Sequence, residues 1–207
     1  MTNTLMQTIA LVEMSITCSV LIIMLLRAFS RNDFPFSIKA LLVLIFANLF
    51  FWPLGMSMAL PLAAYVRGMV GDLSIVTSLL LWSALLPNHQ ATPTPIKWWI
   101  VILAIAFYPF ALGVNMFDPY AWGYGSIVFL VGVLFFALIC GFAGWMKGVW
   151  IIGVAIITWS LRLHESSNLW DYLLDPALAI WALFAAWNEI RKQRNEKARS
   201  GYLFRPG

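Results

Sequence analysis

Long apolar runs recur from one end of this chain to the other. Seven of them approach the roughly 20 residues that a helix needs to cross a bilayer. They fall at 5–26, 40–66, 69–86, 98–117, 126–145, 149–163 and 170–187. None alternates apolar with polar residues as the strand of a membrane barrel does. The pattern predicts an all-α, polytopic transmembrane helix bundle that forms a single domain over residues 1–190, followed by a basic cytoplasmic tail at 191–207.

Composition narrows the class of protein further. Of the 207 residues, 62% are hydrophobic and only 11% are charged, which is too little polar surface to face water. The formal charge of +4 does not indicate a nucleic-acid partner, because six of the thirteen basic residues lie in the last seventeen positions, just after an apolar run. Cys18 and Cys140 both lie inside apolar runs, which argues against a disulfide framework or a metal site. The expected partners are the lipid bilayer and possible membrane subunits, and no cofactor is evident.

The distribution of Lys and Arg predicts the orientation of the bundle. With seven crossings and the N-terminus outside, eleven of the thirteen basic residues fall on the cytoplasmic side, and Arg67 and Arg162 stay outside. This asymmetry predicts a multi-pass protein of the plasma membrane, the inner membrane in a bacterium. The sixth run, 149–163, is short and contains Gly153, so a re-entrant segment is the alternative there. A segment that did not cross would force the basic tail outside, which the charge bias disfavours.

Proline interrupts the second predicted span. Pro53 and Pro61 lie in the run 40–66 with Gly55 between them, and each proline removes a backbone donor. We expect a bend in this span. It either shapes helix packing or opens a path for a solute.

Charged and ionisable side chains collect on the predicted outer side. They are Glu13, Arg67, Asp72, Asp118, Arg162, His164, Glu165, Asp171 and Asp175. Seven of them are candidate ligands for a solute or an ion: Glu13, Arg67, Asp72, Asp118, Arg162, Asp171 and Asp175. The candidates for acid–base chemistry are His164, Glu165 and Asp171.

Glu13 is the most informative single residue, because it lies below the membrane interface, where an ionised carboxylate is costly. It either reaches headgroup water or forms a buried site for a proton or a cation. Thr17, one turn farther along, is expected to share its face. Arg67 is expected to pair with Asp72 across a turn, or to hold a phosphate or carboxylate.

The segment 162–176 is the densest polar stretch. Asn168 with Asp171, and Asp175 before Pro176, have the chemistry of helix starts. Spaced four residues apart, Asp171 and Asp175 would instead share one helical face as a coupled carboxylate pair. Both interpretations remain open from the sequence.

Three functional hypotheses follow. The first is a non-enzymatic membrane protein that binds or transports a small solute, ion or lipid, or serves as a subunit of a larger assembly. The second is a membrane enzyme that acts on a lipid or lipid-linked substrate at the outer face. The third is a structural or interaction protein without a ligand site. The lack of a catalytic motif favours the first.

Overall fold

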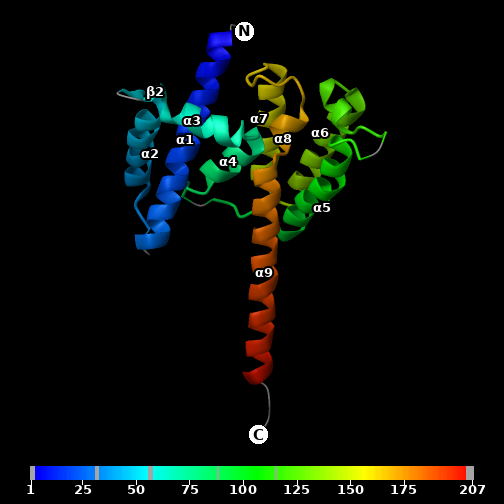
Figure 1. Ribbon diagram of the computed structural model, residues 1–207. Helices are drawn as coiled ribbons and strands as arrows, with labels where there is room; N and C mark the ends of the chain where they lie inside the picture. Colours follow the sequence, from blue (N-terminus) through cyan, green and yellow to red (C-terminus); the bar gives the residue numbers. More distant parts are fainter. Residues whose placement is uncertain (1–2, 31–32, 56–57, 88, 115, 204–207) are drawn as a thin grey trace. The chain divides into compact units, whose positions relative to one another are not determined.

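The computed structural model describes residues 3–30, 33–55, 58–87, 89–114 and 116–203. Within these residues the chain is helical apart from one two-stranded hairpin (Figure 1). It divides into two compact units. Unit 1 comprises Met1–Gln90 with Ala121–Asp175, and unit 2 comprises Ala91–Tyr120 with Pro176–Gly207. Arg31 and the last four positions of the predicted tail lie outside the described residues.

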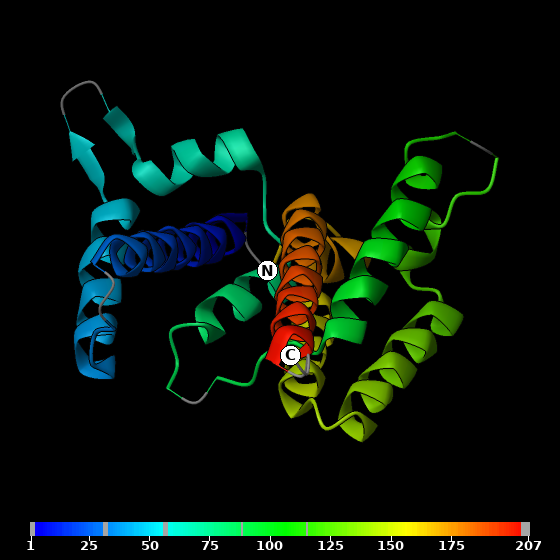
Figure 2. The same cartoon turned by 90° about the horizontal axis from the view of Figure 1, so that it is seen from below.

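Unit 1 begins with two helices that lie side by side, α1 (Asn3–Ser30) and α2 (Phe36–Phe51) (Figure 2). No glycine or proline interrupts α1, so an apolar sequence of this length continues as one helix. Pro35 occupies the N-cap position of α2, directly before the first turn of that helix. Asp33 joins the two helices, because its carboxylate lies 2.9 Å from Arg27 Nε and 2.7 Å from Lys39 Nζ.

The segment 40–66 is not the single bent helix that the sequence suggested. Helix α2 ends at Phe51, and Trp52 is extended because proline at the next position disfavours the helical conformation. Strands β1 (Pro53–Gly55) and β2 (Met58–Pro61) then pair antiparallel. Gly55 has φ +78°, the left-handed region in which glycine avoids strain. The prolines therefore end the helix, and α3 (Leu62–Val70) begins after Pro61.

The predicted third span, 69–86, also differs. Its helical part is α4 (Ile75–Ser83), which has nine residues, and residues 71–74 form a loop. Ser74 begins α4 in the manner of an N-cap, since its side chain accepts a hydrogen bond from Thr77 N at 3.1 Å.

The remainder of unit 1 contains α6 (Ile127–Phe142), α7 (Met146–Ser160) and the single turn α8 (Trp170–Leu173). A short 3₁₀ helix, η1 (Tyr120–Tyr124), precedes α6. Helix α7 runs through Gly153 without a break. It ends at Ser160. Arg162, which follows the C-cap Leu161, has φ +51°, and the bonds from Arg162 N to Trp159 O and from Leu163 N to Thr158 O form a Schellman motif.

Unit 2 pairs α5 (Thr94–Ala111) with α9 (Pro176–Leu203). Lys97 Nζ on α5 lies 2.7 Å from Glu189 Oε2 on α9. Helix α9 extends through most of the predicted tail, so residues 191–203 continue the last helix (Figure 1). The predicted span 170–187 is interrupted, because Leu174 is extended between α8 and α9.

Three helical segments of the described chain are long and apolar enough to cross a membrane: Thr4–Ser30, Thr94–Ala111 and Trp170–Lys197. Three shorter apolar helices accompany them: Phe36–Phe51, Ile127–Phe142 and Met146–Ser160. The architecture therefore agrees with an all-α protein that associates with membranes.

Candidate functional site

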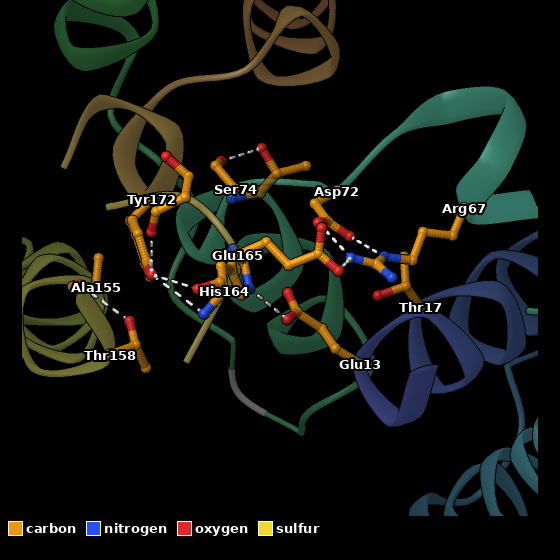
Figure 3. A network of polar contacts seen from close by, with 12 residues as sticks. Glu13, Thr17, Arg67, Asp72, Ser74, Ala155, Thr158, His164, Glu165 and Tyr172 are labelled. Carbon is orange, nitrogen blue, oxygen red and sulfur yellow. Dashed lines mark hydrogen bonds and ion pairs between the residues drawn. The ribbon is translucent and has the colours of Figure 1, made fainter. Parts of the chain in front are cut away.

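Five of the residues singled out from the sequence meet inside unit 1, and we call them the charged network. They are Glu13 on α1, Arg67 on α3, Asp72 in the loop before α4, and His164 with Glu165 in the loop after α7 (Figure 3). Four separate chain segments therefore supply one site. Such convergence is what a binding site requires and what a set of unrelated helix caps would not produce.

The centre of the network is a pair formed by Glu13 and His164. Glu13 Oε2 lies 2.8 Å from His164 Nε2, and the side chains are 14% and 4% exposed. Tyr172 holds the imidazole from the other side, with the two rings stacked at a centroid distance of 4.8 Å. The Tyr172 hydroxyl accepts a hydrogen bond from His164 N at 3.1 Å and donates to Ser166 O at 2.9 Å. The imidazole is thus fixed by stacking, by the carboxylate and by the backbone.

Arg67 binds two carboxylates at once. Its Nε and Nη2 donate to the two oxygens of Asp72, the latter at 2.8 Å, and Nη2 also donates to Glu165 Oε1 at 3.0 Å. The pairing of Arg67 with Asp72 is confirmed. Asp72 and Glu165 together raise the pKa of Arg67. Arg67 Nε and Nη2 are thus already engaged by protein carboxylates, which reduces the capacity of Arg67 to hold a phosphate.

The charges of the network do not balance. Three carboxylates, those of Glu13, Asp72 and Glu165, face one guanidinium and one imidazole. With the imidazole neutral or protonated, the sum remains negative. The network therefore favours a proton, a metal cation or a cationic solute over an anion.

Three hollows adjoin the network. A cleft of about 420 Å³, here the Arg67 cleft, is lined by Gln7, Leu11, Ala64, Arg67, Asp72 and Glu165. A groove of about 310 Å³, here the apolar groove, lies among residues of α1, α4 and α7, including Ile9, Val12, Leu79, Trp82 and Val154, and reaches Glu13 and His164. A much smaller cavity touches Ala10, Glu13, Met14, Thr17, Asp72 and Ser78.

Other polar residues position the helices around the network. Asp175 Oδ2 accepts a hydrogen bond from Ser74 N at 2.6 Å and so holds the start of α4. Trp82 Nε1 donates to Thr17 Oγ1 at 3.0 Å and joins α4 to α1. Glu13 and Thr17 line the same small cavity, as expected for two residues on one face of a helix.

Asp171 and Asp175 do not form the carboxylate pair considered above. The helix breaks at Leu174, so the two side chains share no helical face. Asp171 accepts a hydrogen bond from Ser166 Oγ, whereas Asp175 binds Ser74. The helix-start chemistry of Asn168 is present, since its Oδ1 accepts from Trp170 N at 2.9 Å.

Asp118 and Arg162 have local roles in the structure. Asp118 belongs to unit 2, where its carboxylate accepts a hydrogen bond from Tyr120 N at 2.9 Å and shapes a turn. Arg162 is exposed at the end of α7. Among the described residues, no group of three or more His, Cys, Asp or Glu side chains is arranged to hold a metal ion.

Two contributors were missed from the sequence. They are Tyr172, which stacks on His164, and Ser78, which lines the small cavity. No local pattern marks Tyr172 as the support of His164, because the contact depends on the turn between α7 and α8. The spacing of Ser78, one turn after Ser74, is the sequence signal that marks it as a second hydroxyl on the same helical face.

A scan against protein-family models finds no family that matches this chain. Searches of curated proteins and of solved structures likewise find no similar chain. The function is therefore argued from the site itself.

Proposed function

We propose that this chain is a multi-pass membrane protein that binds or transports a small cation or cationic solute at the charged network, without catalysing a reaction. The observation that carries the proposal is the excess of carboxylates, those of Glu13, Asp72 and Glu165. They gather in one helical unit beside the Arg67 cleft and the apolar groove. Ionisable groups at membrane depth are costly, and they typically mark ion or substrate pathways.

The same proposal includes seven crossings, with the N-terminus outside and the basic C-terminus in the cytoplasm. Contacts between residues assigned to the same side support it. Arg67 and Glu165, both assigned outside, form an ion pair. Lys97 and Glu189, both assigned inside, form another. In this arrangement the loop at 71–74 and the short α4 make a broken third crossing, and discontinuous helices of this kind are common at transporter sites.

The test is cation binding by the purified full-length protein in detergent. Thermal unfolding is followed in a panel of NaCl, KCl, MgCl₂ and small ammonium salts at constant ionic strength. We expect at least one cation to raise the melting temperature of the wild type, and Glu13→Gln and Asp72→Asn to reduce that shift. Asp118→Asn is the matched control, because Asp118 lies outside the network. A wild type that responds equally to every salt would refute the proposal.

A second candidate function is a membrane enzyme that acts on a lipid at His164. The observation in its favour is that the Glu13–His164 pair resembles an oriented acid–base pair, with the apolar groove reaching both residues. The hydrogen bonds of Arg67 Nε and Nη2 to two carboxylates weigh against phosphate recognition. Turnover of lipid by purified protein that is lost in His164→Gln would favour this alternative.

A further inference from the structure

The small cavity between α1 and α4 contains two polar atoms that the surrounding chain does not satisfy. Glu13 Oε1 and Ser78 Oγ are buried and have no hydrogen-bond partner within the described residues. Ser78 is 1% exposed, and both residues line this cavity as well as the apolar groove. A buried polar atom without a partner costs about 1–3 kcal/mol, so two of them around one hollow indicate a ligand that contacts both.

The size and lining of the cavity limit that ligand. The space open to the centre of a water-sized sphere is about 10 Å³, which is room for one water or one bare small ion. The side-chain polar atoms that line it are oxygens, from Glu13, Thr17, Asp72 and Ser78. Oxygen ligands are those that hard cations prefer. A single-atom cation therefore fits better than any organic solute.

Charge indicates the valence of the ion. Asp72 pairs with Arg67, which also binds Glu165, whereas Glu13 meets only the imidazole of His164 through Oε2. A neutral imidazole that donates to Oε2 leaves the negative charge of Glu13 itself uncompensated. A water would satisfy the hydrogen-bonding capacity of Oε1 but would not compensate this charge in a site of low dielectric constant. A monovalent cation does both.

We infer that this cavity is a sodium site in which Glu13 Oε1, Ser78 Oγ and Thr17 Oγ1 bind the ion. Thr17 Oγ1 can take part because the hydrogen bond from Trp82 uses only one of its two lone pairs. This inference rests on the proposed function and names its ligand.

The experiment is calorimetric titration of NaCl into the full-length protein in detergent, with choline chloride keeping the ionic strength constant. In the thermal unfolding assay, once sodium exceeds its dissociation constant, each further tenfold increase in sodium should lower the unfolding equilibrium constant about tenfold. We expect KCl to bind at least tenfold more weakly, because the cavity fits a small ion. Ser78→Ala should weaken sodium binding at least tenfold, and Glu13→Gln should abolish it.

Ser19→Ala is the matched control for lost hydroxyl packing. Like Ser78, Ser19 is fully buried. It lies on α1, and its hydroxyl donates a hydrogen bond to Ser15 O and does not line the cavity. This variant should keep the full sodium response. Should Glu13→Gln fail to fold, the sodium response of Ser78→Ala, which keeps the carboxylate, provides the second test.

Equal responses to sodium, potassium and choline would overturn the inference and identify the cavity as a water site. Full sodium binding by Ser78→Ala and Glu13→Gln would overturn it as well. If sodium has no effect but an ammonium salt stabilises the wild type and not Glu13→Gln, the sodium site fails while the proposed function stands. If no cation acts in either assay, both fail.

Discussion

The contact between Glu13 and His164 should be worth about 2 kcal/mol of stability, and a double-mutant cycle can measure it. The variants are Glu13→Ala, His164→Ala and the double substitution. Hydrogen bonds to charged groups contribute about 1.5–3 kcal/mol. Both side chains are largely buried, at 14% and 4% exposure, so solvent screening does not reduce this range substantially.

The single substitutions alone would not isolate the contact. His164→Ala also removes the stacking on Tyr172, a further ~0.5–1.5 kcal/mol. Glu13→Ala leaves the imidazole without its carboxylate, which adds a desolvation cost. The cycle cancels these separate effects and leaves the coupling free energy. A coupling of about 2 kcal/mol corresponds to a change of about 30-fold in the unfolding equilibrium constant.

The assay is reversible unfolding in mixed micelles, with increasing SDS and tryptophan fluorescence as the signal. A second cycle between Glu13 and Ser19 serves as the control, because Ser19 lies about 9 Å farther along α1. Its coupling should be within about 0.5 kcal/mol of zero. A Glu13–His164 coupling equally close to zero would refute the argument that these two residues form the centre of the site.

Two further predictions concern single positions. Arg162→Gly should raise stability by about 1 kcal/mol in a thermal melt, because Arg162 occupies a left-handed position at φ +51°; a loss of stability would contradict this. Gly148→Ala should lower stability by about 1–3 kcal/mol in the same assay, because the new Cβ would overlap the buried ring of Trp145; a gain would contradict it.

The sequence predicted the parts of the site that depend on local chemistry. Arg67 and Asp72 are five residues apart across a turn, so their pairing follows from chain geometry. Glu13 was identified because a carboxylate inside an apolar run demands a partner. The identity of that partner could not be predicted. His164 is 151 residues away, and its contact with Glu13 depends on how α1 packs near the loop after α7.

The segment 40–66 explains why helix boundaries were harder to predict than apolar character. Hydropathy alone treats this segment as one span, because its residues are almost all apolar. Backbone chemistry decides otherwise. Pro53 forces Trp52 into an extended conformation, and Pro61 pairs with Pro53 in a short hairpin. One proline in a membrane helix is commonly accommodated as a kink, whereas two prolines flanking Gly55 end the helix here.

The acidic residues on the predicted outer side thus have different structural roles, and the sequence alone does not distinguish these roles. Glu13 lines the small cavity and has one buried oxygen without a hydrogen-bond partner within the described residues, so it can bind a ligand directly. Asp175 instead holds Ser74 N at the start of α4, and Ser78 lies one turn farther along that helix. Asp175 therefore acts on the cavity by positioning α4. Asp175→Asn should weaken cation binding less than Glu13→Gln, because an amide oxygen still accepts the bond from Ser74 N, whereas the amide at position 13 removes the charge that attracts the ion.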